Sequence, residues 1–411
     1  MPVFYVKAVG NYSRAYQQEK FEATIKKLFN GVVVSPDGKQ INMLDIAMSS
    51  LKGRFNRLWC WTKGMEEYAT KQDHVCAMYT VSLSSKRHPV SGKYDGTSIA
   101  EGQKILATSV WGRANARFKK HGIYPYGCRV SQPHKRDGTV HWHVFVFASY
   151  DDLLKIDEIL KDLAFRENGT ELGAKKHRYD FKFIGKAEGG AKASSYIFRY
   201  ILGALGSLAL KGYTSGDLDK ILAEKMSAEE VWAKTYDIRQ VQFVGGASVG
   251  VWDELRRLED ELDDQHLEAM RLACNDNDFC KYYELQGGHK MGKRSHYAKM
   301  KYDAVMVVNE KLDTATGEVV EDIKESVNAY GEPIMETIGI EYGEKFAHSV
   351  VNRRAKWSIE WGDGSSDGVS QDVRVVEDFS LVPVGLVGTS SFVVRASSDA
   401  LEAYETHVGW V

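Results

Sequence analysis

Residues 131–147 read SQPHKRDGTVHWHVFVF, a polar loop followed by a run of β-branched and aromatic residues. A run of this kind after turn-forming residues predicts a buried β-strand from about Val140 to Ala148. Because side chains alternate between the two faces of a strand, His141 and His143 point to one face and Trp142 to the other. Two neighbouring imidazoles are half of a metal site, although such a pair is more often two polar residues with hydrogen-bond partners.

The segments on both sides of this strand alternate between strand and helix patterns. Their order, β-α-β-β-α-β-α, predicts an α+β domain: a central antiparallel sheet with helices packed on one face, of ferredoxin-like type. Shorter helical patterns and then β-rich patterns follow it. The expected strands are 75–83, 126–130, 140–148 and 179–184, and the expected helices are 11–30, 43–65, 98–122, 149–166, 191–210, 251–262, 265–274 and 278–286.

Length and composition describe an ordinary globular protein. The chain has 411 residues, of which 43% are hydrophobic and 27% charged, enough for two or three domains. No apolar run has the length of a membrane span, and the first residues do not resemble a signal peptide. We therefore expect a protein of the cytoplasm without a membrane partner. The five cysteines are scattered and without Cys-x-x-Cys spacing, which indicates reduced thiols.

Charge is unevenly distributed, although the net charge is only −2. From Lys52 to Arg136 there are sixteen Lys and Arg against five Asp and Glu, whereas from Trp357 to Val411 there are two against nine. The first block is a candidate surface for DNA phosphates and the last an acidic tail. Two ordinary solvated faces explain the same counts equally well.

A second candidate element is the segment 194–203, SSYIFRYILG, in which Tyr196 and Tyr200 are four residues apart. On a helix this spacing places both phenols on one face, roughly 6 Å apart along the axis, with Arg199 beside them. Tyrosines at this spacing among apolar residues are more often packing residues whose hydroxyls reach the surface.

The histidine pair alone leaves several kinds of site open. A cupin site would need a glutamate about four residues after His143, where Phe147 stands, and is excluded. A zinc site of three histidines would need a third from a neighbouring strand, for which His74 or His177 is available.

Taken together, the histidine strand, the basic block and the downstream tyrosine helix form a narrower pattern. The sequence here resembles the HUH endonucleases, and among them the bacteriophage replication gene A protein family of rolling-circle initiators. Further segments in family order extend the resemblance over roughly residues 40 to 345. The residues that carry it are Pro133-His134, Asp137-Gly138-Thr139, His141-Trp142-His143, Tyr196 to Tyr200, Gly245-Gly246, 251–257, 277–288 and 330–340.

The resemblance implies a site-specific, metal-dependent endonuclease and strand-transferase for single-stranded origin DNA. It implies that His141 and His143 bind Mg²⁺ or Mn²⁺ and that Tyr196 and Tyr200 are nucleophiles. The product would be a 5′-phosphotyrosine on the protein and a free 3′-hydroxyl for a host polymerase. Since the phenol of tyrosine has a pKa near 10, the metal or Arg199 must favour the phenolate.

Two positions depart from the family pattern. Gln132 stands where the family usually has a carboxylate as third metal ligand, and His134 is the other candidate for that role. An amide oxygen binds hard cations more weakly than a carboxylate does. Arg199 stands where a lysine is expected beside the second tyrosine.

A nucleotide-binding loop is excluded. Residues 287–293, GGHKMGK, have the frame of a phosphate-binding loop, but Arg294 replaces the required Ser or Thr and no hydrophobic strand precedes them. Unwinding of DNA would therefore require a host helicase.

Two other classes of function remain open. One alternative is a non-catalytic DNA-binding replication or repressor protein on the same fold. The other is a metal hydrolase for small phosphodiesters, which would form no covalent intermediate.

We expect the chain to have four regions. They are a helical region at 1–72, the HUH endonuclease domain at 73–215, a helical region at 216–290 and a mixed region with an acidic tail at 291–411.

Overall fold

The structure is a computed structural model that describes residues 11–185, 192–206, 208–291, 295–312, 319–328, 331–352 and 358–362. By its internal contacts the chain divides into two compact units, Met1–Gly246 with Arg354–Val411, and Ala247–Arg353. This division is coarser than the four regions expected from the sequence, whose boundaries stay a prediction. No helix in the described ranges is both long and apolar enough to cross a membrane.

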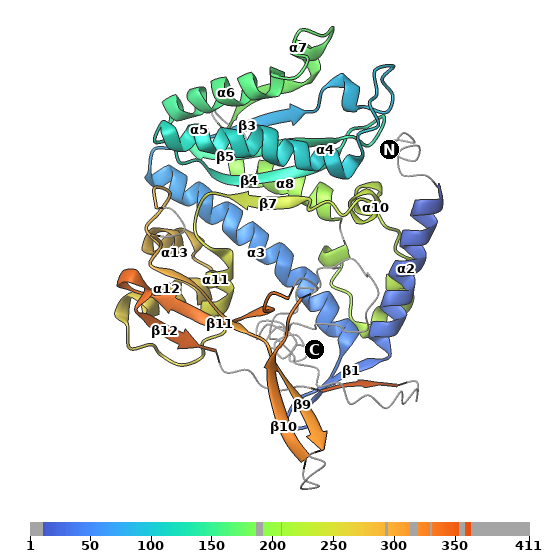
Figure 1. The fold of residues 1–411 in the computed structure, drawn as a ribbon, viewed down its shortest axis with the longest axis vertical. Coiled ribbons are helices and arrows are strands. Elements are labelled where there is room, and N and C mark those ends of the chain that lie inside the picture. The colour runs from blue at the N-terminus through green and yellow to red at the C-terminus, as the bar shows by residue number, and fades with distance from the viewer. Residues whose placement is uncertain are drawn as a thin grey trace. The chain divides into compact units, whose positions relative to one another are not determined.

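A five-stranded antiparallel sheet forms the centre of the first unit (Figure 1). Its strand order is β6-β3-β5-β4-β7, and every neighbouring pair is antiparallel. The strands that the sequence predicts are present, and β7 lies at the edge beside β4. The bounds are β3 Val75–Ser82, β4 Tyr126–Pro133, β5 Val140–Ala148, β6 Tyr179–Ile184 and β7 Val241–Val244.

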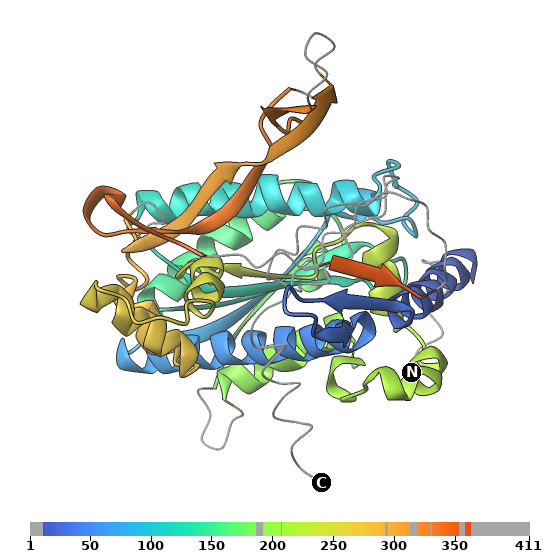
Figure 2. The same ribbon diagram turned by 90° about the horizontal axis from the view of Figure 1, so that it is seen from below.

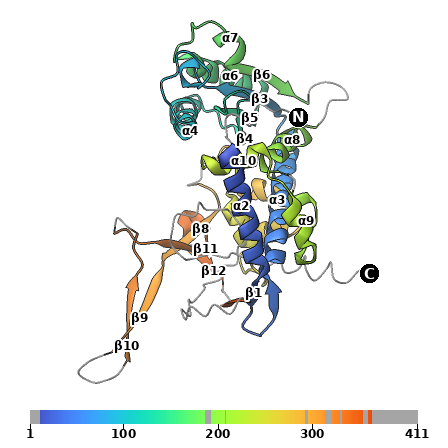
Figure 3. The same ribbon diagram turned by 90° about the vertical axis from the view of Figure 1, so that its right-hand side faces the viewer.

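Helices cover both faces of this sheet, so the expectation of helices on one face is wrong. Figures 2 and 3 show one layer made by α4 (Ile99–Ile105), α5 (Arg113–Lys120) and α6 (Tyr150–Phe165). The opposite layer contains α3 (Met43–Lys71) and α8 (Ala193–Leu205). Both faces of β5 are therefore buried, which explains why it reads as a continuous apolar run after its histidines. The mixed helical and antiparallel composition agrees with the predicted α+β class.

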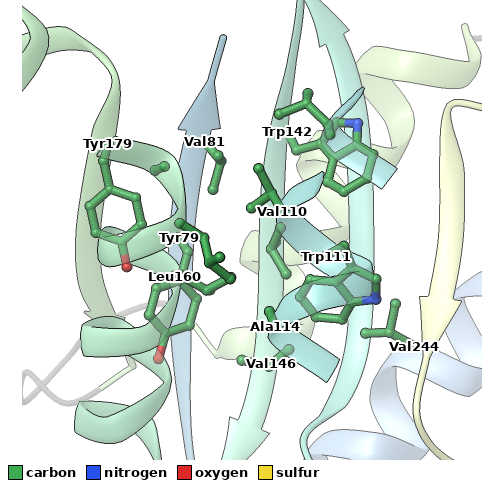
Figure 4. Close-up of a cluster of buried hydrophobic side chains, with 14 of the residues drawn as sticks. Tyr79, Val81, Val110, Trp111, Ala114, Trp142, Val146, Leu160, Tyr179 and Val244 are labelled. Atoms are coloured by element: carbon green, nitrogen blue, oxygen red, sulfur yellow. The ribbon is translucent and has the colours of Figure 1, made fainter. Parts of the chain in front are cut away.

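The main hydrophobic core lies between the sheet and the α4–α6 layer (Figure 4). Alternate residues of β5, among them Trp142 and Val146, point into it, as do Tyr79 of β3 and Leu160 of α6. A π-helical turn, η2 (Leu106–Gly112), joins α4 to α5 and contributes three further core residues, Leu106, Val110 and Trp111. Burial of a large apolar side chain contributes roughly 1.5–3 kcal/mol to the stability of the folded state. The core therefore fixes the side to which the even-numbered residues of β5 point.

Helix ends follow local capping chemistry. The Asn42 side chain accepts a hydrogen bond from Leu44 N at 2.8 Å, which begins α3. Ser98 and Glu101 cap α4 reciprocally. The helix expected over 191–210 is shorter, because Gly206 ends α8 with a φ of 77° and only the short turn η3 (Leu208–Leu210) follows.

The remaining elements of the first unit are short apart from one helix. A three-stranded sheet has the order β13-β1-β2. The bounds are α2 Asn11–Phe29, β1 Gly31–Val34, β2 Gln40–Asn42, η1 Ser85–Arg87, α7 Ala174–His177, η4 Ser215–Asp217, α9 Leu218–Ala223, α10 Ala228–Thr235 and β13 Ser358–Trp361.

The second unit combines three short helices with strands (Figure 1). The helix expected over 251–262 ends at Leu255, because the Arg271 side chain binds the Leu258 carbonyl and Glu268 accepts from Leu262 N. These contacts hold the acidic segment after Leu255 in a non-helical path. The bounds are α11 Val249–Leu255, α12 Gln265–Asn275, α13 Phe279–Leu285, β8 Ala298–Ala304, β9 Met306–Leu312, β10 Val319–Glu325, β11 Met335–Tyr342, η5 Glu344–Phe346 and β12 His348–Val351. Of the acidic block from Trp357 to Val411, the described residues are 358–362, and the rest of the expected tail lies outside the described residues.

Candidate active site

The face of the sheet beneath α8 carries both histidines of β5. Trp142 points to the opposite face, where its Nε1 donates to Gln103 Oε1 at 2.7 Å. His141 and His143 lie with their Nε2 atoms 3.2 Å apart. His143 Nδ1 is 3.2 Å from the hydroxyl of Thr80 on the neighbouring strand β3. The alternation of side chains thus places the imidazole pair where the sequence predicts it.

Both imidazoles are neutral at physiological pH. Burial, together with the neighbouring His143 and His134, lowers the pKa of His141 to about 3. Burial also lowers the pKa of His143 to about 4, with a contribution from Lys182. Neutral imidazole is the form that binds a metal ion.

The spacing of the two Nε2 atoms suits a shared cation. Two ligand atoms that are each about 2.1 Å from one ion, at an angle of about 100°, lie about 3.2 Å apart. Two neutral imidazoles cannot direct lone pairs at each other without a proton or a cation between them. The donor set therefore fits a divalent ion.

Gln132 and His134, the two candidates for a third ligand, both lie near His141. Gln132 pairs directly with His141 across β4 and β5, which places its side chain on the same face. The ring of His134 has its centre 6.3 Å from that of His141. Of the two alternative third histidines, His74 lies 3.1 Å from the Tyr126 hydroxyl through Nδ1, and His177 is an exposed residue of α7.

Two further residues belong to this neighbourhood, and sequence reasoning gave neither a role. Asp137 is buried, with Oδ2 2.9 Å from His88 Nδ1 and Oδ1 3.4 Å from His134 Nδ1. Burial raises the pKa of Asp137, but the contacts with His134 and His88 outweigh it and hold that pKa well below its usual range. The signals for Asp137 were its position in the turn before β5 and its place among the residues that carry the family resemblance, whereas His88 is distant in sequence.

The two tyrosines of α8 lie against the same face as the histidines. Their hydroxyls are 3.5 Å apart. The ring of Tyr200 is 4.6 Å from the ring of His143, between centres, and Phe145 packs against both tyrosines. The structure thus brings together Tyr196, Tyr200, His141 and His143 from two elements about fifty residues apart.

Lys182 of β6 binds one of the two tyrosine hydroxyls directly. Its Nζ donates to the Tyr196 hydroxyl at 2.6 Å. Arg199 is less direct, with its guanidinium 6.0 Å from the centre of the Tyr196 ring. Sequence reasoning missed Lys182, although strand alternation places it opposite Met78 and on the histidine face.

The environments of the two phenols differ. Burial raises the pKa of Tyr196, but hydrogen bonds from Lys182 and Tyr200 outweigh it, so the pKa lies below its ordinary value. Burial raises the pKa of Tyr200 well above its ordinary value, and the neighbouring Tyr196 raises it further. Tyr196 is thus the phenol that loses its proton more readily.

Comparisons with known proteins find phage replication proteins. The family model of the bacteriophage replication gene A protein matches residues 11–203, and this segment of the chain belongs to that family. The replication protein of Haemophilus phage HP1 is 30% identical over 354 residues, which cover 84% of this chain and 42% of that protein. The replication gene A protein of Escherichia phage P2 is 29% identical, covering 78% of this chain and 42% of that protein.

A third relative carries a more specific name. A probable replication endonuclease from a prophage-like region of Salmonella typhi is 25% identical over 378 residues, covering 86% of this chain and 44% of that protein. The chain thus spans about two fifths of the length of these curated relatives. No solved structure matches the chain significantly.

Proposed function

We propose that this chain initiates rolling-circle replication of a phage or related mobile element by cutting single-stranded origin DNA and joining its 5′ end to a tyrosine. The observation that carries this proposal is the position of Tyr200, whose ring lies 4.6 Å from that of His143 while its hydroxyl lies 3.5 Å from that of Tyr196. Two nucleophiles and a metal-binding pair are thereby within reach of one phosphodiester.

The topology supports an HUH nuclease domain. Numbered along the chain, the first four strands of the large sheet lie in the order 4-1-3-2, with helices between the first and second and between the third and fourth. This is the ferredoxin-like arrangement of two crossed βαβ units. The word endonuclease in the name of the Salmonella typhi relative supports the same class.

The proposed metal ligands are His141 and His143, with Gln132 or His134 as a third. A divalent ion such as Mg²⁺ or Mn²⁺ would supply Lewis-acid stabilisation of the negative charge on the non-bridging phosphate oxygens. The residues themselves provide neutral imidazoles, and Thr80 holds His143 by its other ring nitrogen, which fixes the direction of the ligating atom.

Tyr196 is proposed as the first nucleophile. Lys182 stabilises its phenolate, and the phenolate oxygen forms a bond to phosphorus while the bond to the 3′-oxygen breaks. That oxygen takes up a proton and becomes the 3′-hydroxyl that a host polymerase extends. The energy of the broken phosphodiester is kept in the phosphotyrosine, so the reaction is reversible.

Tyr200 is proposed to act second. While Tyr196 carries a phenolate, that charge opposes ionisation of Tyr200. Once Tyr196 is esterified, its negative charge lies on the phosphodiester and Tyr200 is the remaining phenol of the pair. The two nucleophiles would thus be used in sequence, first to open the origin and then to cut its regenerated copy.

The proposed partners are single-stranded origin DNA and a host helicase and polymerase. The excess of Lys and Arg between residues 52 and 136 supports binding to a phosphate backbone. The rival function is a DNA-binding protein without the cleavage reaction.

A direct assay separates these functions. The chain is incubated with Mn²⁺ and a pool of labelled single-stranded DNA that covers the replicon of its own gene, and adducts that survive denaturation are counted. The proposal predicts an adduct for the wild type and none for the Tyr196→Phe/Tyr200→Phe variant. Retention of DNA by the wild type without any adduct would instead establish the non-catalytic protein.

A further inference from the structure

We propose that His88, His134 and Asp137 form a second divalent-cation site, distinct from the His141–His143 pair. The three side chains offer two imidazole nitrogens and a carboxylate oxygen, all within 4.8 Å of one another. This donor set suits a transition-metal ion such as Mn²⁺ or Zn²⁺. The inference does not depend on the proposed nuclease reaction, because ion binding alone tests it.

Two separations between donor atoms match those around one ion. Atoms bound at about 2.1 Å from an ion lie about 3.0–3.4 Å apart at bond angles between about 90° and 109°. His88 Nδ1 is 2.9 Å from Asp137 Oδ2, and His134 Nδ1 is 3.4 Å from Asp137 Oδ1. His134 is the most exposed of the three, at 41% of its side chain, so it can move to close the site.

The negative charge of the buried Asp137 carboxylate favours binding of a cation. Its side chain is only 1% exposed and pairs with the two imidazoles, and its Oδ1 also accepts a hydrogen bond from Thr139 N at 3.1 Å. The cations next to His88 in sequence are engaged elsewhere: Lys86 binds Glu167, and Arg87 binds Asp95 and Glu167. A buried carboxylate is costly unless positive charge or several hydrogen bonds compensate it.

The backbone around the cluster is fixed without any ion. His134 N donates to Thr139 O at 2.7 Å, and Gly138 N donates to His134 O at 2.9 Å. The carbonyl of Gly138 also accepts from the buried Trp232 Nε1 at 2.8 Å. Two of the three ligands are therefore held in one tight loop, while His88 comes from the segment just after η1.

The second site also affects the choice of a third ligand at the His141–His143 site. If His134 binds the second ion, Gln132 is the remaining candidate for the third ligand there. The second ion would join the segment after η1 to the turn before β5, and so steady the strand that carries His141 and His143.

A hydrogen-bonded cluster is the alternative arrangement. Nδ1 of each histidine would then carry a proton and donate a hydrogen bond to Asp137, so neither nitrogen would have a lone pair for a metal. Ion stoichiometry separates the two arrangements, because only the metal site adds a binding equivalent.

The experiment is a titration of the chain with Mn²⁺, and separately with Zn²⁺, followed by calorimetry and by the electron paramagnetic resonance of free Mn²⁺. The variants are His88→Gln, His141→Ala/His143→Ala and the triple combination. His121→Gln, an exposed histidine after α5, is the matched control. Thermal melting with chelator present checks that each variant is folded.

We expect two equivalents for the wild type and for His121→Gln. His88→Gln should lose one equivalent or weaken it at least about ten-fold, the double variant should lose the other, and the triple variant should bind neither. Asp137→Asn should behave as His88→Gln does. An equivalent that His88→Gln removes assigns an ion to this cluster whether or not the His141–His143 pair binds another. Binding unchanged by His88→Gln would overturn the second site.

Discussion

Lys182 on β6 donates a 2.6 Å hydrogen bond to the hydroxyl of Tyr196 on α8. The contact joins a sheet edge to the tyrosine helix and favours the phenolate form of Tyr196, which offsets the opposite effect of its burial. The same face of the sheet carries the imidazole pair, so the proposed tyrosine nucleophile and the proposed cation site lie on one face.

Replacing Lys182 tests this relationship. Lys182→Met should slow adduct formation near pH 7.5 by about ten-fold, or about 1.4 kcal/mol in activation free energy. The rising limb of the pH–rate profile should move to higher pH, because the phenol of Tyr196 then ionises less readily. Lys182→Arg should restore part of the rate at low pH. Lys155→Met, which removes a surface lysine paired with Glu158, is the control and should leave the profile unchanged; an unshifted profile in Lys182→Met contradicts the role.

The two tyrosines should differ when they are replaced one at a time. Tyr196→Phe should abolish the first cleavage of a single-stranded substrate, since the pKa of Tyr200 is raised. Tyr200→Phe should still form the first adduct but fail to transfer the strand to a second origin. Both steps are measured with two oligonucleotides of different length. First cleavage lost in Tyr200→Phe and kept in Tyr196→Phe would reverse the order of action.

Thr80 should control metal binding through His143. Thr80→Val removes the hydroxyl near His143 Nδ1 with little change in shape, and the affinity of the pair for Mn²⁺ should fall by about 10-fold to 100-fold. Thr80→Ser keeps the hydroxyl and should bind nearly as the wild type does. Equal affinities for the Val and Ser variants, measured by calorimetry, would show that Thr80 does not orient the ring.

The buried histidines make stability depend on pH in metal-free protein. Their pKa values of about 3 and about 4 lie below the ordinary value near 6.5, so below that pH the unfolded chain binds more protons than the folded chain. The free energy of unfolding should therefore fall as pH drops from about 6.5 towards 4, by about 1.4 kcal/mol per pH unit for each histidine.

Urea unfolding with chelator, at pH 7 and pH 5, measures this loss. His141→Gln/His143→Gln should lose less stability between the two pH values than the wild type does, whereas His121→Gln should behave as the wild type. An equal loss in the double variant would mean that other groups carry the pH dependence.

Much of the fold follows from local sequence. Alternation along β5 separates His141 from Trp142, and Asn42 and Ser98 mark helix starts through their side-chain caps. The second helical layer was missed because local patterns give the apolar face of α3 but not the surface that it covers. The early end of α11 depends on Arg271, sixteen residues beyond Leu255, and no local pattern contains that contact.

The residues of the candidate site were likewise only partly predictable from the sequence. His141, His143, Tyr196 and Tyr200 have periodic spacing and so were found as pairs. Other residues of the site are recognisable only by contacts with residues distant in the chain. Lys182 donates a hydrogen bond to Tyr196, and His88 pairs with Asp137. The proximity of groups from separate elements follows from packing, which spacing does not encode.

The residue that becomes joined to DNA can be identified chemically. The adduct between the wild-type chain and single-stranded DNA is digested with protease and nuclease, and the nucleotide-bearing peptide is sequenced by mass spectrometry. The account predicts a nucleotide joined through its 5′-phosphate to Tyr196 in the first cleavage. A nucleotide on any residue other than Tyr196 or Tyr200, or cleavage of DNA without a covalent adduct, would contradict it.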